Sequence, residues 1–528
     1  MLIAARSLPH GHTLHGDVCI VGGGPAGLTL AHQLARGQAR VIVVESGGHA
    51  LRQATQSLHC GEVAGQPYYP LDACRYRLLG GSTARWGGWC RPLDGLDFEP
   101  RAWVADSGWP FPRAALDPFY RRAEQLLRNG AKGDGAARWG ARTSTRLLPD
   151  GEDAFENVEF ELHPSRFGDI YGPIARRSRH FDLLLNATVL GLEIDRKEST
   201  ISAARVATVG RKPLTIRANV FVLAAGGIEN ARILLVSESA RGRSPGNDYD
   251  LVGRYFADHM HVPLGVLRAE DGAADFYQAR TVDGVKVRGG VVATEHSRRR
   301  VRGLGFAATL HNADDPHDVL SLAQTNDGYL SLQHLVRSVR HGHLPDRARH
   351  HIGVVLGRPT EVSRLVYRRF FPKRGRTFLI GCRAEQAPNR DSRVTLDTRC
   401  DALGVRQVRL DWRLSPADLE NIEAGQRDLA RALSAHQVEM FAPVTSRGNG
   451  GQYGVAGGAH HMGTTRMHRD ARHGVVDEHC RVHGTDNLYV TGSSVFPTGG
   501  WAPPTLTILA LAMRLGDHLG AGNREATT

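Results

Sequence analysis

The stretch DVCIVGGGPAGLTLAHQLARGQARVIVVESG, residues 17–47, decides the fold class of this chain. Its first apolar run, residues 17–21, predicts a short buried strand. Residues 28–36 repeat apolar side chains at helical spacing, and residues 41–44 form a second apolar run. The stretch therefore predicts a βαβ unit, in which a helix connects two parallel strands.

Three glycines and one acid indicate what this unit binds. Gly22, Gly24 and Gly27 follow the spacing G-x-G-x-x-G between the first strand and the helix. Glycines there let the backbone approach a pyrophosphate, whose charge lies at the helix N-terminus. Glu45 ends the second strand, about twenty residues further on, where an acid accepts hydrogen bonds from a ribose. Together these features predict a dinucleotide-binding unit of the Rossmann type, although they do not separate NAD from FAD.

Four later segments extend the nucleotide-binding pattern along most of the chain. Residues 80–89, GGSTARWGGW, form a second glycine-rich loop, and residues 183–195 alternate like an edge strand. Residues 220–235 predict a strand, a glycine turn and a helix, and residues 487–519 predict the same order again. We therefore expect one domain that is built from separate segments of the chain, with a second domain inserted between those segments.

The region between these segments predicts a second domain. Period-2 runs such as SRVTLD (392–397) and VRQVRLDWRL (405–414) indicate antiparallel strands. The expected fold class is α/β, or α+β overall, with a Rossmann-type cofactor domain and an antiparallel-sheet substrate domain. The boundaries that we predict are 12–105, 180–261 and 455–525 for the cofactor domain, and 106–179 and 262–454 for the substrate domain, with a basic helical insert at 331–376.

Composition bounds the class of protein. The 528 residues are 41% hydrophobic and 23% charged, as in a soluble globular protein. The seven cysteines are odd in number and never form a C-x-x-C pair, which argues against a disulfide framework or a thiolate zinc site. No run approaches the roughly 18 to 20 apolar residues of a membrane span, and the N-terminus lacks a secretory signal. We expect a cytoplasmic protein without a metal site.

The net charge of +12 is partly local. Residues 337–376 hold eleven Arg or Lys against Asp346 and Glu361, and 11 − 2 gives a net charge of +9. Such a segment could dock nucleic acid, anionic lipid or an acidic partner. A solvated helical insert is the favoured interpretation, because no nucleic-acid-binding motif accompanies it. We therefore expect neither a nucleic-acid partner nor a membrane span.

The ordered motifs resemble those of one enzyme family. DSGWPFPRAALDPFY (106–120), VGRYFADHMH (252–261), EQAPNRDSRVTLD (385–397) and the block that begins at Gly458 follow the N-terminal unit. Their order and spacing resemble the glucose–methanol–choline (GMC) oxidoreductases, FAD-dependent enzymes that oxidise alcohols. The resemblance covers nearly the whole chain and is strongest with the sugar-oxidising branches.

The resemblance implies the residues that hold FAD. It places Gly22, Gly24, Pro25 and Ala26 along the pyrophosphate, Glu45 on the adenosine ribose, Val189 at the adenine, and Gly81 and Ser82 near the ribityl chain or the isoalloxazine. It further implies cofactor contacts at Ser46, Ala225, Gly492 and Thr505.

Two other features bear on the FAD. Arg85 stands where some relatives carry a histidine bonded to the flavin, so non-covalent FAD is expected. The apolar helix that follows Pro504 would direct its positive N-terminal end at the flavin N1–C2=O edge.

The segment GGAHHMGTTRM (457–467) carries the expected base. The resemblance implies that His460, three residues before Gly463, removes a proton from the substrate hydroxyl. A neutral imidazole suits this role, because its ordinary pKa of about 6.5 lies near working pH. His461 points to the opposite side if the segment is extended, which favours a supporting or structural role.

One departure from the family concerns the partner of this base. The family places a second histidine or an asparagine just before the C-terminal helix, where this chain has Pro503. Proline offers no side-chain hydrogen bond and no N–H. The partner is therefore missing or supplied from elsewhere, and Trp501 and Thr498 are near in sequence. Glu385 is a candidate contact for a substrate amine.

The resemblance predicts oxidation of an alcohol on a sugar-like or aminoglycoside substrate to an aldehyde or ketone. Enzymes of this kind serve antibiotic or other secondary-metabolite biosynthesis. Two alternatives remain open at this point. One is a sugar dehydrogenase that passes electrons to a quinone or a protein in place of O₂, and the other is a non-redox flavoprotein lyase.

Overall fold

The computed structural model describes most of the chain. The described residues are 1–128, 146–149, 151, 153–163, 165–269, 272, 274–282, 284–312, 352–353, 356, 377–441 and 455–525. Apart from residues 352, 353 and 356, the basic segment 337–376 lies outside them. No described helix combines the length and the apolar composition that a bilayer crossing requires.

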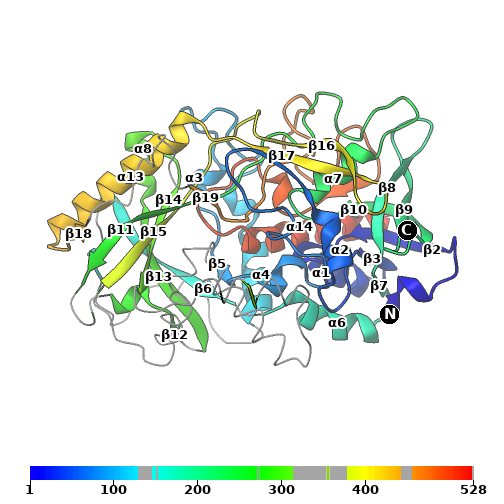
Figure 1. Cartoon of the computed structure of the whole chain (residues 1–528), viewed down its shortest axis with the longest axis horizontal. Coiled ribbons are helices and arrows are strands. Elements are labelled where there is room, and N and C mark those ends of the chain that lie inside the picture. The colour runs from blue at the N-terminus through cyan, green and yellow to red at the C-terminus, as the bar shows by residue number, and fades with distance from the viewer. Residues whose placement is uncertain are drawn as a thin grey trace.

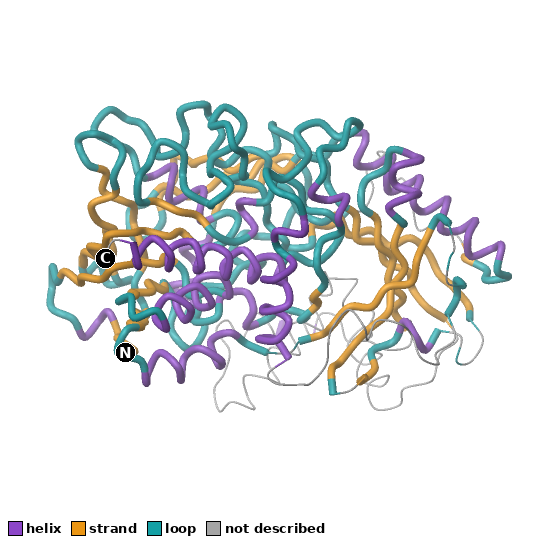
Figure 2. Tube along the Cα trace, turned by 180° about the vertical axis from the view of Figure 1, so that it is seen from behind, coloured by secondary structure: helices purple, strands orange, loops and turns teal. Residues whose placement is uncertain are grey.

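An eight-stranded sheet forms the half of the molecule that contains both termini (Figures 1 and 2). Its strand order is β1-β7-β3-β2-β10-β9-β8, with β20 beside β10. The strands β1, β7, β3, β2, β10 and β20 run parallel, whereas β9 and β8 are antiparallel. The bounds are β1 (Leu2–Ala4), β2 (Thr13–Val21), β3 (Val41–Glu45), β7 (Phe181–Leu185), β8 (Thr188–Ile194), β9 (Ile201–Ala207), β10 (Pro213–Leu223) and β20 (Leu488–Val490).

The predicted βαβ unit is confirmed as β2, α1 (Pro25–Arg36) and β3. All five residues of β3 are buried, as a parallel strand with both faces covered requires. The segment 220–235 also folds as expected, with β10 followed by α7 (Glu229–Val236), and 487–519 gives β20 followed by α14 (Thr505–Glu525). The helices α1 and α14 pack against each other.

The prediction of one edge strand at 183–195 is wrong. The segment belongs to two strands, β7 and β8, and only β8 lies at the sheet edge. The chain turns between them at Asn186, whose φ is 59°. Asparagine tolerates this left-handed conformation better than most residues, so the turn is encoded locally. The alternation continued across the turn and concealed it.

A nine-stranded sheet forms the other half of the molecule, at the left of Figure 1. Its order is β18-β11-β15-β14-β13-β6-β5, with β12 beside β13 and β19 beside β11, and all of its pairs are antiparallel. The bounds are β5 (Trp89–Cys90), β6 (Phe155–Leu162), β11 (Met260–Arg268), β12 (Arg280–Val282), β13 (Val285–Ala293), β14 (Phe306–Asn312), β15 (Thr377–Ala384), β18 (Met440–Phe441) and β19 (Ala456–Gly457).

The helix α13 (Pro416–Ala435) covers one face of this sheet. Gln426 donates from Nε2 to the carbonyl of Leu264 at 2.7 Å, and a Cβ on Gly425 would lie 2.4 Å from the Phe306 ring. Ser415 caps the helix start by accepting from the Asp418 amide. The opposite face of the sheet is therefore the one that α13 leaves uncovered.

The period-2 runs at 392–397 and 405–414 form strands, but not in the nine-stranded sheet. They give β16 (Arg393–Cys400) and β17 (Arg406–Trp412), which pair in a separate three-stranded sheet with β4 (Gly61–Gly65). The remaining elements are η1 (Ala5–Ser7), α2 (Gln53–Gln56), η2 (Ser57–His59), η3 (Gly81–Ala84), α3 (Gly95–Phe98), η4 (Arg113–Ala115), α4 (Asp117–Arg128), α6 (Phe167–Arg177), η5 (Asp275–Tyr277), α8 (Glu295–Val301) and η6 (Ser493–Val495).

Two helices of the 106–179 segment lie beside the eight-stranded sheet. α4 packs against α14, and α6 packs against α1 and β7. This part of the expected substrate domain therefore contacts the cofactor-binding half of the molecule, whereas β6, which the same segment overlaps, belongs to the nine-stranded sheet.

Candidate active site

Four of the expected cofactor residues lie at one edge of the eight-stranded sheet. Gly22 follows β2, Glu45 ends β3, Ala225 follows β10, and Gly492 follows β20. Because these strands run parallel, their carboxyl ends meet at the same edge. In open α/β sheets this edge is where ligands bind.

The backbone of the glycine turn leaves room for a phosphate. Gly22 has a φ of 114°, and a Cβ there would lie 2.5 Å from the carbonyl oxygen of Ala224. A Cβ on Gly24, by contrast, would meet no atom within 4 Å. Pro25 occupies the first turn of α1, where its missing N–H costs nothing. The turn therefore combines a conformation that only glycine adopts readily with open space at a helix N-terminus.

Glu45 faces this turn. Its carboxylate accepts hydrogen bonds from the amides of Gly23 and Gly47, both at 2.7 Å. Burial raises the pKa of Glu45, and these two amides and Arg77 act in the opposite direction. The carboxylate is held beside the glycine turn, in the position from which an acid reaches a ribose.

The second glycine loop touches the first. The Gly80 amide donates to the Gly23 carbonyl at 2.8 Å, and a Cβ on Gly81 would lie 3.1 Å from Cα of Gly24. Ser82 follows in η3 and is exposed. Arg85 ends this loop with its guanidinium carbon 5.1 Å from the centre of the Tyr76 ring. The two loops thus form one continuous backbone surface.

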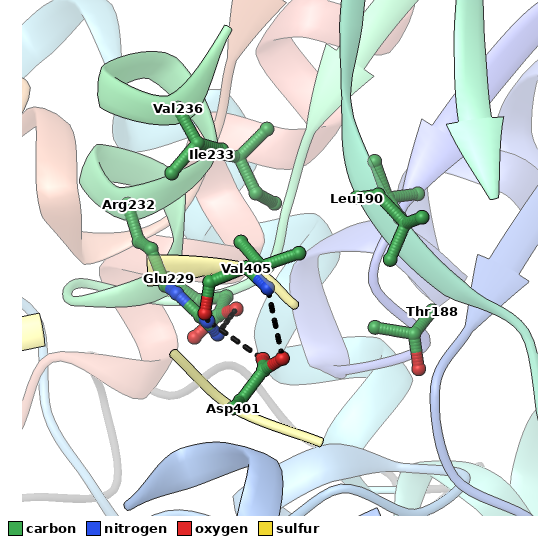
Figure 3. A pocket seen from close by; sticks show the side chains of 9 residues that line it. Thr188, Leu190, Glu229, Arg232, Ile233, Val236, Asp401 and Val405 are labelled. Carbon is green, nitrogen blue, oxygen red and sulfur yellow. Dashed lines mark hydrogen bonds and ion pairs between the residues drawn. The ribbon is translucent and has the colours of Figure 1, made fainter. Parts of the chain in front are cut away.

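A small pocket lies beside β8 and α7, with room for about one water molecule (Figure 3). Glu229, Arg232 and Asp401 form an ion network in its wall, and Arg232 donates to Asp401 at 2.7 Å. Three arginines hold the pKa of Glu229 well below its usual range. The full lining is Thr188, Val189, Leu190, Glu229, Arg232, Ile233, Val236, Asp401 and Val405.

The remaining expected cofactor residues have the following places. Ser46 Oγ lies 2.7 Å from Oγ1 of Thr188 and accepts from Arg77, which also donates to Glu229. Thr505 is the first residue of α14. Val189 lines the small pocket described above, whose interior is too small for an adenine ring. Ala26 is buried in the first turn of α1.

His460 is paired with a histidine that the sequence did not single out. Nδ1 of His460 lies 2.9 Å from Nδ1 of His259, and Nε2 of His259 lies 2.9 Å from the carbonyl oxygen of Gly500. A carbonyl oxygen only accepts, so His259 carries its proton on Nε2. Its Nδ1 must then accept, and His460 donates from Nδ1. Nε2 of His460 is therefore left with a free lone pair, which is the atom a general base needs.

Both rings are neutral at physiological pH. Burial lowers the pKa of His259 to about 3, and Arg383 acts in the same direction. Burial, His259 and Arg383 also hold the pKa of His460 well below 6.5. The hydrogen-bond assignment above requires this neutral state, and the two observations agree.

A buried carboxylate fixes the backbone of His460. Its amide donates to Oδ1 of Asp258 at 2.8 Å, and the Tyr68 hydroxyl donates to Oδ2. Burial raises the pKa of Asp258 to about 6. The segment that contains Asp258 and His259 runs antiparallel to the one that contains His460, with Ala257 and Met462 bonded through both amides.

His461 has different surroundings from His460. Its ring centre lies 6.0 Å from that of Tyr68 and 5.9 Å from that of Phe256, and its Nε2 is 3.7 Å from Sγ of Cys74. Burial lowers its pKa to about 3. The ring therefore packs among aromatic side chains. Burial is the first cause that lowers the pKa of eight histidines: His32, His59, His259, His261, His460, His461, His468 and His518.

Comparison with known proteins agrees with this arrangement. A family model described as GMC oxidoreductase matches residues 388–512, and one described as FAD dependent oxidoreductase matches residues 17–241. The chain therefore carries an FAD dependent oxidoreductase domain and a GMC oxidoreductase domain. It is an FAD-dependent oxidoreductase.

The chain is 25% identical to paromamine 6'-oxidase of Streptomyces fradiae, over 94% of its own length and 90% of the relative's. It is 24% identical to 2-methyl-1,2-propanediol dehydrogenase of Mycolicibacterium austroafricanum, over 95% of each chain. Among solved structures, formate oxidase superposes with a TM-score of 0.58 at 17% identity, over 98% of this chain and 100% of the other. The last comparison shows the shared fold.

The surface formed by the two glycine loops and Glu45 fits FAD. A dinucleotide held along one sheet edge needs open space at the glycine turn, an acid for its ribose and a second loop beside the first, and Gly24, Glu45 and the contact between the two loops supply these. Bound FAD supplies the hydride acceptor for alcohol oxidation.

Three expectations about substrate contacts differ from the structure. Glu385 is fully buried and accepts from Arg101 and Arg298, so its oxygens are not available to a substrate amine. These arginines lower the pKa of Glu385 to about 2. The Trp501 indole N–H donates to Asp94 at 2.6 Å, and is therefore not free to replace the family's second partner.

Thr498 is likewise engaged, because its hydroxyl donates to the Asp97 carbonyl at 2.6 Å. Pro503 itself is buried. The second histidine of this site is His259, which contacts the Nδ1 side of His460 and leaves its Nε2 side open. Sequence reasoning missed it, although the D-H-x-H spacing at 258–261 was a usable signal.

Proposed function

We propose that this enzyme oxidises an alcohol carbon of a polyhydroxylated, sugar-like substrate, with Nε2 of His460 as the general base. The observation that supports this most is the chain of hydrogen bonds from His460 through His259 to the Gly500 carbonyl. It leaves one lone pair on a neutral imidazole, on an atom that no described residue contacts by a hydrogen bond. The residues of the glycine turn, Glu45 and the second glycine loop would hold the FAD.

His460 takes the proton of the substrate hydroxyl at Nε2. The ring then carries a positive charge, and its Nδ1–H bond to His259 becomes charge-assisted, which strengthens it. Asp258 holds the backbone of His460 and so fixes the direction of the ring. General-base catalysis of this kind contributes roughly 10²- to 10⁴-fold in rate.

The names of two relatives support an alcohol substrate. Paromamine 6'-oxidase and 6'''-hydroxyparomomycin C oxidase are named for aminoglycoside compounds, so a sugar-like substrate, and biosynthesis of a secondary metabolite, are reasonable for this chain. An amine-bearing substrate is not favoured, because Glu385 is already bound by arginines. We therefore propose a polyhydroxylated substrate that carries no amino groups.

We propose O₂ as the electron acceptor, with a dehydrogenase as the alternative. The alternative is kept because a relative that matches over 95% of this chain is named a dehydrogenase. Oxygen consumption during turnover supports the oxidase, and turnover only with an added quinone or dye supports the dehydrogenase. No feature of the described residues favours the non-redox lyase.

The test uses the holoenzyme under anaerobic conditions. His460→Ala should retain FAD but slow substrate-dependent bleaching of the flavin by at least about 100-fold. His461→Phe, which keeps an aromatic ring between Tyr68 and Phe256, should show a much smaller loss. A larger loss in His461→Phe than in His460→Ala would overturn the assignment of the base.

We also propose that the FAD is not covalently attached. Arg85 lies over the Tyr76 ring and offers no imidazole to the flavin. Acid precipitation should therefore release the flavin into the supernatant. Flavin that stays in the pellet would contradict the proposal.

A further inference from the structure

We propose that the substrate carries an anionic group, a carboxylate or a phosphate, which pairs with Arg383 beside His460. The inference rests on the proposed function and narrows its substrate class. It concerns a residue of the nine-stranded sheet that neither the motifs nor the cofactor site explains.

Arg383 lies on the face of the sheet opposite α13. In the register of β15, Arg383 is paired with His261 of β11 and with Ala307 of β14, so their side chains share one face. The neighbours Cys382 and Ala384 point to the other face, where Ala384 is paired with Phe306, a residue that packs on α13. Strand alternation thus directs Arg383 away from the helix-covered side.

Arg383 has no partner of opposite charge among the described residues. Its Nε and Nη1 atoms are buried and make no hydrogen bond. The contacts of its guanidinium are the ring faces of Trp89, at 5.4 Å, and Phe160, at 5.7 Å. Burial lowers the pKa of Arg383 to about 10, and no carboxylate opposes this. The side chain is therefore a cation at neutral pH that no described residue neutralises.

Several other buried arginines among the described residues are neutralised. Arg101 and Arg298 share Glu385, and Arg298 also pairs with Asp97. Arg232 pairs with Asp401. Buried charges are ordinarily paired, because desolvation of a lone ion is costly. Arg383 has no such partner among the described residues and stands beside the base, where perturbed and unpaired groups mark functional positions.

His261 connects Arg383 to the base. Its ring centre lies 6.3 Å from that of His460, and its Nε2 is also buried without a hydrogen-bond partner. Arg383 lowers the pKa of both rings, so the three groups lie close together. Arg383, His261 and His460 each keep part of their surface exposed, whereas His259 is completely buried. The three therefore lie close together, each with part of its surface open.

A ligand that contacts these three side chains should carry a negative charge. An anion there would satisfy the guanidinium, whose N–H groups form a fork that matches carboxylate and phosphate oxygens. The hydroxyl that reacts at Nε2 of His460 would belong to the same molecule. Trp89 is partly exposed next to the guanidinium and offers an apolar face to a sugar ring. The favoured substrate is a sugar acid or a sugar phosphate.

Binding of matched sugars to the anaerobic holoenzyme tests this. Glucose, glucuronate, glucose 6-phosphate and glucosamine would be titrated while the flavin spectrum and tryptophan fluorescence are followed. The wild type should bind glucuronate or glucose 6-phosphate at least about tenfold more tightly than glucose, and glucosamine most weakly. A preference for one of the two anions identifies the group as carboxylate or phosphate.

Variants of Arg383 separate its charge from its volume. Arg383→Met should lose the preference for the anionic sugar, a change of roughly 10- to 100-fold, because an unpaired ion would remain on the ligand. Arg383→Lys keeps the charge and should retain part of the preference. Arg268→Met is the matched control, since it removes an exposed arginine that lies over Phe441 on the same sheet. It should leave the preference unchanged.

Two results would overturn the proposal. One is a wild type that binds glucose or glucosamine as tightly as both anionic sugars. The other is an Arg383→Met protein that keeps the wild-type preference for the anionic sugar or, if that protein does not fold, an Arg383→Lys protein whose preference equals or exceeds that of the wild type. Failure of the proposed function would give a different result from failure of this proposal. The anionic sugars would bind with the stated preference, but none of the sugars would reduce the flavin.

Discussion

Removal of His259 should slow flavin reduction without loss of FAD. In His259→Phe, Nδ1 of His460 loses the acceptor that now lies at 2.9 Å. A neutral hydrogen bond contributes about 1 kcal/mol, and 1.36 kcal/mol corresponds to a factor of ten, so the tautomer with a free Nε2 should become several- to tenfold less populated. Loss of ring orientation adds to this, as outer partners of metal-bound histidines contribute 10- to 100-fold. We expect a fall in the reduction rate of about 10- to 100-fold.

The pH profile of the variant follows from the same hydrogen bond. In the wild type the base is neutral above its lowered pKa, so the reduction rate should stay flat from pH 8 down to about pH 6. In His259→Phe the imidazolium form of His460 loses the acceptor of its Nδ1–H, so the pKa of His460 should not rise, and the lower rate should be equally flat over this range.

Stopped-flow reduction of the anaerobic holoenzyme measures both quantities. His259→Asn offers an amide oxygen to Nδ1 and should recover part of the rate, whereas His518→Phe, which replaces an exposed histidine of α14, serves as the control. A reduction rate in His259→Phe equal to that of the wild type, or a loss of rate that begins above pH 6 only in the variant, would refute the reasoning.

Three further predictions follow from other parts of the molecule. Glu385→Gln should reduce the free energy of unfolding by about 3 to 5 kcal/mol, because Arg101 and Arg298 would stay buried with a weaker partner; an unchanged urea midpoint would contradict this. Gly22→Ala should yield protein without bound FAD, or no folded protein, because the new Cβ would meet the Ala224 carbonyl at 2.5 Å; flavin absorbance of the purified variant reports this. Acidification from pH 7.5 to pH 5.5 should destabilise the fold, because the unfolded chain protonates near pH 6.5 the histidines whose pKa burial lowers well below the ordinary value in the folded chain, namely His59, His259, His261, His460 and His461. The raised pKa values of Asp97 and Asp258, both about 6, act in the opposite direction, and equal urea midpoints at the two pH values would contradict the expectation.

Local patterns predicted the cofactor half of the fold well. The βαβ unit at 17–47 depends on residues that are near each other in sequence, so its glycines and Glu45 could be assigned without a structure. The split of 183–195 into β7 and β8 was missed, because a single residue with a positive φ, Asn186, does not interrupt the alternation of its neighbours.

Long-range pairings could not be predicted in the same way. The partner of β17 is β4, more than three hundred residues away, and no local pattern specifies a parallel partner. The hydrogen bond between His259 and His460 crosses 201 residues of sequence. The lack of a carboxylate partner for Arg383 among the described residues depends on residues that are distant in sequence. The sequence of β15 alone indicates only an arginine in a strand.

The hydrogen bonds of His259 have a consequence for assembly of the enzyme. They join three separate stretches of chain: the start of β11, the loop of His460 and the loop of Gly500. The proton on His460 is therefore directed to Nδ1 only after the last seventy residues have docked onto the rest of the protein. A ribosome-bound or truncated chain could complete the N-terminal glycine turn and still lack a competent base. The active site therefore becomes competent late in folding, because the tautomer of His460 depends on the docking of the C-terminal segment.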